Sequence, residues 1–137
     1  MKKLLSTAAA LGLALLLGAP AHADVSPTTV EGATTIDTAK ARELFEQETA
    51  FVDVRKNSDW DAGRVPGAIH IELKKVYSSD TLAAEVGKDE PVVIYCNGES
   101  CLRSSKASSM AVDWGWKQVY YYRDGFPAWK AAGNPVE

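Results

Sequence analysis

The strongest structural signal in the sequence is the apolar run PVVIY at residues 91–95, which ends at Cys96. Its β-branched residues predict a buried strand. The polar stretch that follows contains Gly98 and a second cysteine, Cys101. Apolar residues with helical spacing then predict a helix over 103–114. This order places Cys96 at the junction between a buried strand and a loop that leads into a helix.

The same alternation of strand and helix patterns runs along most of the chain. Further strands are expected at 50–54, 68–71 and 118–122, and further helices at 37–48, 72–77, 80–86 and 127–132. Strands that are apolar on both faces and connected through helices indicate a mainly parallel sheet covered on both sides. Ligands of such sheets bind at the carboxyl ends of the strands. Cys96 lies at such a position.

Residues 1–23 have the features of a secretory signal. Lys2 and Lys3 precede the apolar stretch Leu4–Leu17, and Ala21-His22-Ala23 is a pattern typical of signal-peptidase sites. The apolar stretch is shorter than the roughly 20 residues that a membrane-spanning helix needs. We therefore expect cleavage after Ala23 and a location in the bacterial periplasm.

The rest of the chain is long enough for one compact domain with its own core. Residues 24–35 are rich in Ser, Pro, Thr and Gly and are expected to be an N-terminal leader, with a single domain at 36–137. The formal net charge is −3, and it becomes −5 without Lys2 and Lys3. An acidic chain without a basic cluster argues against nucleic acid, or a membrane after signal cleavage, as a partner.

The position of Cys96 favours a reactive thiol over a cysteine that only packs in the core. Gly98 permits a tight turn, and successive backbone N–H groups in such a loop form an anion-binding concavity. The helix that follows adds the partial positive charge of its N-terminus. A thiolate, persulfide, sulfonate or phosphate is stabilised in such a loop, and Arg103 offers a further positive charge.

Three segments of the sequence resemble signatures of the rhodanese superfamily. They are DVRKNSDWDAGRVPGAIHI at 53–71, YCNGESCLRSS at 95–105 and YRDGFPAWKAAGNPVE at 122–137. On this basis the chain is identified as an exported single-domain rhodanese-like protein. The resemblance implies a five-stranded, mainly parallel sheet flanked by helices on both faces. It also implies transfer of sulfane sulfur from a thiosulfate-like donor to a thiol or cyanide, without a metal or organic cofactor.

Site residues follow from the same resemblance. Cys96 takes the position of the nucleophile that carries the persulfide. Asp53 and Arg55 match scaffold positions beside the active-site loop and are expected to form a structural ion pair. Arg103 is expected to help hold an anionic donor. The backbone of the intervening loop is expected to bind the donor and the persulfide; its residues are Asn97, Gly98, Glu99, Ser100, Cys101 and Leu102.

The loop also departs from the family pattern, which is C-x-x-G-x-R in the sulfurtransferases. Related phosphatases and arsenate reductases use C-x5-R, whereas six residues separate Cys96 from Arg103 here. Loop length therefore does not decide the substrate. Tyr95 stands where those phosphatases have histidine, which disfavours that activity. Thiol-redox or arsenate/phosphate-type chemistry with Cys96 and Cys101, and a non-catalytic sulfur-carrier or binding module, are the alternative functions.

Three interpretations of Cys101 are open from the sequence. It is a resolving thiol for an oxidised or persulfidated Cys96, a disulfide partner of Cys96, or a space-filling residue. The C-x4-C spacing matches neither a thioredoxin-type nor a haem-attachment motif. A reversible functional role is favoured over a structural crosslink. A small sulfur donor, a thiol acceptor and a periplasmic thiol protein are the expected partners. His70 is expected to be structural, and no metal site is predicted.

Overall fold

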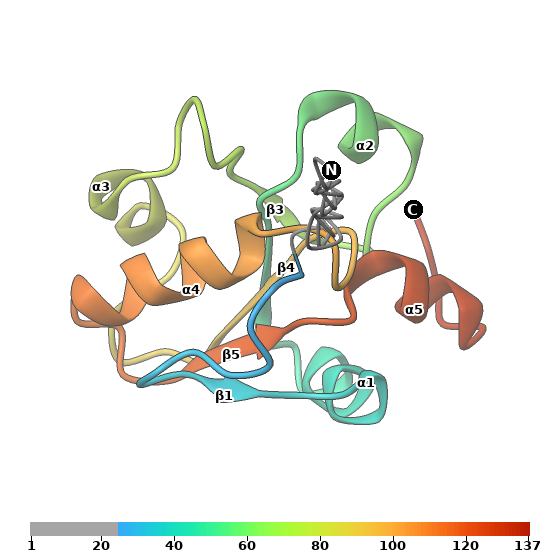
Figure 1. Cartoon of the computed structure of the whole chain (residues 1–137), viewed down its shortest axis with the longest axis horizontal. Coiled ribbons are helices and arrows are strands. Elements are labelled where there is room, and N and C mark those ends of the chain that lie inside the picture. Colours follow the sequence, from blue (N-terminus) through green and yellow to red (C-terminus); the bar gives the residue numbers. More distant parts are fainter. Residues whose placement is uncertain (1–24) are drawn as a thin grey trace, which may run out of the picture.

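The computed structural model of the chain describes residues 25–137 (Figure 1). The expected signal segment 1–23 and its cleavage point after Ala23 lie outside the described residues. Within residues 25–137, no helix combines the length and the apolar character needed to cross a bilayer.

The core of the fold is a five-stranded, fully parallel sheet with the strand order β1-β5-β4-β2-β3. This confirms the predicted sheet. The central strand β4 pairs with a neighbour on each side, which explains why its sequence is apolar without alternation. The strands are β1 (Thr34–Thr35), β2 (Ala50–Asp53), β3 (Ile69–His70), β4 (Val92–Tyr95) and β5 (Val119–Tyr122).

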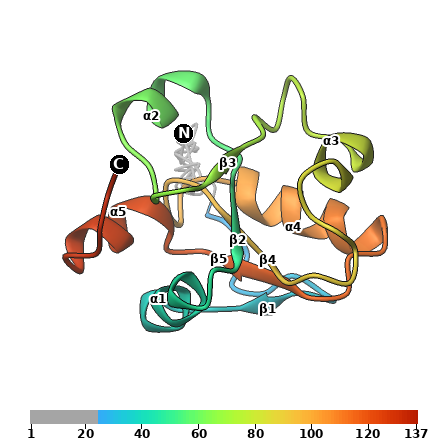
Figure 2. The same cartoon turned by 180° about the vertical axis from the view of Figure 1, so that it is seen from behind.

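Helices cover both faces of this sheet (Figures 1 and 2). Helices α3 and α4 pack on one face and α1 and α5 on the other, as the two core clusters of buried side chains show. Helix α2 lies beyond the carboxyl end of β3. The helices are α1 (Thr38–Glu46), α2 (Asn57–Ala62), α3 (Ser79–Ala83), α4 (Arg103–Asp113) and α5 (Gly125–Ala131).

Side chains of β4 alternate between the two core clusters. Val92 and Ile94 pack on the side of α3 and α4, whereas Val93 and Tyr95 pack on the side of α1 and α5. All four residues are completely buried. Full burial of such a side chain contributes about 1.5–3 kcal/mol to folding. Strand β4 is therefore a rigid support for Cys96, the residue that follows it.

The secondary structure differs from the sequence-based expectation in three short segments. Strand β1 lies inside the 24–35 segment, for which no strand was predicted, because its two exposed residues carry no apolar pattern. Helix α2 has the polar sequence NSDWDA and was missed for the same reason. The helix predicted at 72–77 is wrong: the segment makes a single turn around the carbonyl group of Glu72. That turn stops because Ser78 caps the next helix with a capping box.

Candidate active site

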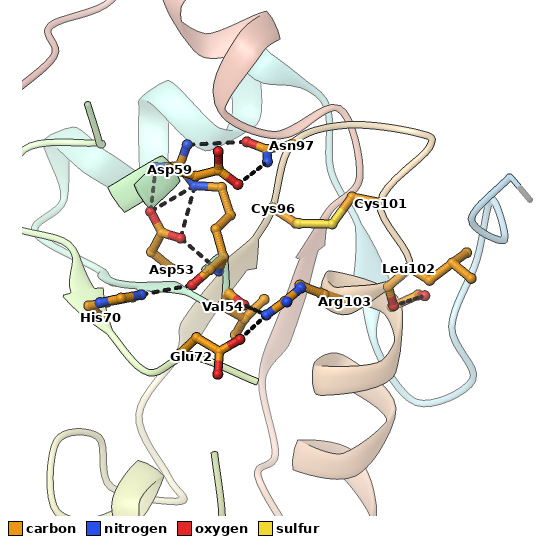
Figure 3. The surroundings of a disulfide bond; sticks show 12 residues. Asp53, Val54, Asp59, His70, Glu72, Cys96, Asn97, Cys101, Leu102 and Arg103 are labelled. Carbon is orange, nitrogen blue, oxygen red and sulfur yellow. Dashed lines mark hydrogen bonds and ion pairs between the residues drawn. A yellow bond between two sulfur atoms is a disulfide. The ribbon is translucent and has the colours of Figure 1, made fainter. Parts of the chain in front are cut away.

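Cys96 lies directly after β4 and is almost completely buried, with 1% of its surface exposed. Its carbonyl oxygen accepts a hydrogen bond of 2.9 Å from the N–H of Phe126, at the start of α5. Its sulfur is joined to Cys101 in a disulfide, with a Cα–Cα distance of 6.3 Å (Figure 3). Of the three interpretations of Cys101, the disulfide is the one that this structure contains.

The loop from Cys96 to Cys101 is a tight turn with free backbone donors. Gly98 has φ of 105°, a conformation that favours glycine, and its carbonyl oxygen accepts from the N–H of Cys101 at 3.0 Å. Among the described residues, no acceptor bonds the N–H groups of residues 97–100. These groups are therefore available to an anion in the loop.

Arg103, the first residue of α4, extends away from this loop and toward β3 (Figure 3). Its guanidinium group forms an ion pair with Glu72 and donates to the carbonyl oxygen of Val54 at 3.3 Å. The Glu72 side chain is only 5% exposed. The charge of Arg103 is balanced by this carboxylate, so contact with an anionic donor stays a prediction.

Glu72 holds a negative charge in a buried position because Arg103 is beside it. Burial raises the pKa of a carboxyl group, but the hydrogen bond and charge of Arg103, together with backbone N–H groups of Lys74 and Lys75, outweigh burial, and the pKa of Glu72 falls below its ordinary value. The pair fixes the start of α4 against β3.

Glu72→Gln is expected to lower the free energy of unfolding by about 3 kcal/mol at pH 7, because it leaves the Arg103 charge without its counterion. The folded-state pKa lies below the ordinary 4.5, so the pair stabilises fully above that pH. Its contribution falls as the pH drops through the lowered value. Urea unfolding at pH 7 and pH 3 checks whether the difference from wild type narrows in acid.

The control for this substitution is Glu43→Gln, which breaks an exposed ion pair with Lys40. Such an exposed pair contributes little to stability, because water screens its charges. A Glu72→Gln effect as small as that of Glu43→Gln, or one that is equal at both pH values, contradicts the stabilising role of the buried pair.

Asp53 and Arg55 form a buried ion pair beneath the loop. Asp53 is 0% exposed and Arg55 is 2% exposed. Arg55 contacts both carboxylate oxygens of Asp53 and donates to the carbonyl oxygen of Gly63 at 2.6 Å. Burial lowers the pKa of Arg55, but the hydrogen bonds to Asp53 and the nearby acidic groups together outweigh burial, and the net pKa is raised. Its guanidinium carbon also lies 4.6 Å from the ring centre of Phe126.

Asn97, the residue after Cys96, is held by this ion pair and by α2. Its Oδ1 accepts from Arg55 at 3.2 Å and its Nδ2 donates to Asp59 at 2.9 Å. The side-chain amide therefore connects Arg55 with Asp59 and fixes the first residue of the loop. Asp59 lies within the 53–71 signature, but no role was predicted for it, because the polar helix α2 carries no apolar spacing.

The far side of the loop is held by Ser26, near the start of the described chain, and by Arg123, which directly follows β5. The carbonyl oxygen of Glu99 accepts from the N–H of Ser26 at 2.7 Å. Arg123 donates to the carbonyl oxygen of Ser26 at 2.9 Å and pairs with the Glu99 carboxylate at 3.4 Å. Neither Ser26 nor Arg123 was singled out from the sequence.

One signal in the sequence identifies Arg123 and Glu72 in retrospect. Each follows a predicted strand within two residues, just as Cys96 follows 91–95. Carboxyl ends of parallel strands meet at one edge of the sheet, so residues directly after them lie near one another. Applied to every strand, this rule places both residues beside the loop.

A cleft of about 740 Å³ opens beside the disulfide. Cys101 contributes to its wall and is half-buried, whereas Cys96 does not line it. The two cysteines of the disulfide therefore differ in their access to this cleft. The lining residues are Leu73, Lys74, Ser100, Cys101, Leu102, Arg103, Lys106 and Met110.

His70 contributes to the packing beside Arg55. Its Nε2 donates to the carbonyl oxygen of Arg55 at 2.8 Å, and its ring stacks on Trp60 with the ring centres 4.6 Å apart. Over residues 25–137, no group of three or more His, Cys, Asp or Glu side chains is placed to hold a metal ion.

A cysteine at the carboxyl end of the central strand, followed by a loop and a helix N-terminus, defines a class of parallel α/β domain with a loop-borne thiol site. The particular family follows from comparison with known proteins. Residues 37–132 match the model of the rhodanese-like domain. The chain belongs to the rhodanese-like domain family, as its sequence signatures predicted.

Relatives within this family differ in their described roles. The HTH-type transcriptional regulator Rv0324 of Mycobacterium tuberculosis is 35% identical over 119 residues, which cover 87% of this chain and 50% of that protein. The chain thus spans half the length of this curated relative.

Solved structures with the same fold include a protein of unknown function from Rhodopseudomonas palustris, described as a possible tyrosine phosphatase. It is 29% identical, with a TM-score of 0.63, over 77% of this chain and 85% of that one. The human single-domain sulfurtransferase TSTD1 is 20% identical, with a TM-score of 0.60, over 72% of this chain and 96% of that one. At that identity, the likeness to TSTD1 shows the shared fold alone.

Proposed function

We propose that this chain is a sulfurtransferase in which Cys96 carries sulfane sulfur as a persulfide. The observation that carries the proposal is the position of Cys96 at the end of β4, before a loop whose N–H groups at residues 97–100 have no acceptor among the described residues. Those donors and the N-terminus of α4 stabilise a thiolate or persulfide. Membership of the rhodanese-like family is consistent with this chemistry.

The proposed cycle begins with attack of the Cys96 thiolate on the outer sulfur of thiosulfate. The sulfur–sulfur bond of the donor breaks, sulfite leaves with the bonding electrons, and Cys96 becomes a persulfide. An external acceptor such as cyanide then takes the outer sulfur and releases the Cys96 thiolate.

Cys101 supplies a second outcome for the persulfide. Its thiolate attacks the inner sulfur, on Cys96, so that the Cys96–Cys101 disulfide forms and hydrosulfide leaves with the bonding electrons. The disulfide of this structure is the expected product of that step. Two external thiols then return the protein to its dithiol form.

A second candidate function is thiol–disulfide exchange without sulfur transfer. The disulfide itself favours it, because Cys101 is open to a cleft and Cys96 is not. In this case the protein cycles between dithiol and disulfide but never gains a sulfur atom. Phosphatase- or arsenate-type chemistry has less support, because Arg103 is paired with Glu72.

The test is intact-mass spectrometry of reduced protein treated with thiosulfate. We expect Cys101→Ser to gain the mass of one sulfur atom, because the thiol that resolves the persulfide is absent. Wild type should instead release hydrosulfide and lose two hydrogens as the disulfide forms. Disulfide formation in wild type with no sulfur gain in Cys101→Ser would favour thiol exchange. No reaction in either protein would favour a non-catalytic module.

We also propose that the protein is exported to the periplasm after cleavage behind Ala23, where a thiol protein or a small thiol acts as its partner. The signal pattern of residues 1–23 supports this. The mass of the protein recovered from a periplasmic extract reports the cleavage point and the disulfide together.

A further inference from the structure

We infer that a small, negatively charged thiol reduces the Cys96–Cys101 disulfide by entering the cleft beside α4 and attacking Cys101. The inference rests on the disulfide stage of the proposed function and adds the class of reductant and the sulfur that it attacks. The cleft, its charges and the unequal access of the two sulfurs support it.

Access directs the attack to Cys101. An incoming thiolate must approach one sulfur from the side opposite to the other sulfur. Cys101 forms part of the cleft wall, whereas Cys96 is 1% exposed and packs among the buried residues on the α4 face. In the disulfide form of this structure, Cys101 is the cysteine that lines a cleft large enough for a second molecule.

The environment of the leaving sulfur favours the same direction. Attack on Cys101 forms a bond from the external sulfur to Cys101 Sγ, breaks the Cys96–Cys101 bond and leaves the electron pair on Cys96. Thiol–disulfide exchange is faster when the departing thiolate is stabilised. The Cys96 thiolate departs beside the unpaired N–H groups of residues 97–100. A second thiol then attacks the mixed disulfide at its external sulfur and releases the Cys101 thiolate.

Charges at the cleft select an anionic thiol. Lys74 and Lys106 are exposed and line the cleft, and none of the residues that line it is acidic. Arg103 is neutralised by Glu72, which leaves the two lysines as the unbalanced charges. The whole chain carries a formal net charge of −3, so this basic cleft contrasts with the rest of the protein.

The size and walls of the cleft indicate a small molecule. Its volume of about 740 Å³ lies in the range of small-molecule sites. Leu73, Leu102 and Met110 add apolar side chains to its lining. A thiol with a short apolar chain and a carboxylate satisfies both features.

The experiment measures the reduction rate of the oxidised protein by three thiols of different charge. They are 3-mercaptopropionate, 2-mercaptoethanol and cysteamine, which are anionic, neutral and cationic. Each rate is divided by the thiolate concentration and by the rate of the same thiol with 2-hydroxyethyl disulfide, which removes intrinsic reactivity. We expect the normalised rate to be highest for 3-mercaptopropionate and lowest for cysteamine.

Lysine variants test whether the cleft causes this order. Lys74→Ala and Lys106→Ala should each slow 3-mercaptopropionate about two- to fivefold, the effect of one exposed charge, and leave 2-mercaptoethanol unchanged. Lys130→Ala is the matched control, because Lys130 is exposed on α5 and does not line the cleft. Added salt should reduce the differences between the thiols.

Mapping the mixed disulfide tests which sulfur is attacked. Acid quenching early in the reaction, followed by blocking of free thiols, preserves the intermediate. Glu99 lies between the two cysteines, so cleavage after Glu99 places them on separate peptides. We expect the external thiol on the Cys101 peptide and the blocking group on the Cys96 peptide.

A normalised rate that is independent of charge, or a mixed disulfide on Cys96, overturns the inference. The reaction contains no sulfur donor, so its outcome is separate from the persulfide test. A protein that gains no sulfur from thiosulfate but shows the expected order of thiols rejects the sulfurtransferase and keeps the reductant site. A protein that gains sulfur from thiosulfate but does not show the expected order of thiols keeps the sulfurtransferase and rejects the reductant site.

Discussion

Replacement of Cys96 by serine should reduce thiosulfate:cyanide sulfur transfer by about 10³-fold or more, the order of loss seen when an enzyme nucleophile is removed. A serine hydroxyl forms no persulfide, and the thiolate, not the neutral group, is the attacking species. Cys96 is 1% exposed at the end of β4, so the similar size of serine preserves packing. The measurement is thiocyanate formation under saturating thiosulfate.

Cys101→Ser is the matched control, because both substitutions remove the same disulfide. Loss of a crosslink that closes so short a loop costs less than about 3 kcal/mol in either variant. Cys101→Ser should retain transfer to cyanide and lose the release of hydrosulfide without an external acceptor. Circular dichroism establishes that both variants fold. If Cys96→Ser keeps its activity, or Cys101→Ser loses transfer to cyanide as completely as Cys96→Ser does, the assignment of the nucleophile is wrong.

Gly125→Ala should destabilise the protein by about 3 kcal/mol and slow sulfur transfer. Gly125 has φ of 64°, where a side chain costs about 1–2 kcal/mol. A methyl group there would also overlap the carbonyl oxygen of Cys96 and lie 2.8 Å from the nitrogen of Gly98. Overpacking of this kind costs about 1–3 kcal/mol. The atoms that must move belong to the active-site loop, so activity should fall with stability.

Gly133→Ala separates the cost of the left-handed backbone conformation from the cost of the overlap with the loop. Gly133 has φ of 80°, but a methyl group at this position meets nothing within 4 Å. Urea unfolding of both variants should show a cost of about 1 kcal/mol for Gly133→Ala, with unchanged activity. Equal effects of the two substitutions would show that the close approach between α5 and the loop does not matter.

The sequence predicted the elements whose pattern is strong over several residues. The β-branched apolar residues of 91–95 favour a strand, and the helix that begins at Arg103 has regular apolar spacing. Strand β1 and helix α2 were missed, because a two-residue edge strand and a six-residue polar helix are stabilised by the neighbours they contact. Such contacts are not encoded in local periodicity.

In the candidate site, too, the residues within a local pattern were predicted and those that depend on distant contacts were not. Cys96 and the segment 97–103 were identified because they are contiguous, and Asp53 and Arg55 because they belong to a signature. Glu72 was not identified, since its role depends on a partner 31 residues away. Its contact with Arg103 balances the charge that was expected to hold a donor. The position of the site is therefore predictable from the sequence, whereas the pairing of its charged groups depends on the three-dimensional fold.

The two ends of the active-site loop are anchored independently of each other. Cys96 is fixed by β4 and by the N–H of Phe126, and Arg103 is fixed by Glu72 and Val54. These contacts do not involve residues 97–102, although the disulfide also joins Cys101 to Cys96. The number of intervening residues can therefore change while the nucleophile and the start of α4 stay in place. The loop length can therefore vary on the same scaffold. This explains how a rhodanese-like fold accommodates six residues between Cys96 and Arg103, where the sulfurtransferase pattern has four. A grafted shorter loop would change what the site admits without requiring a new core.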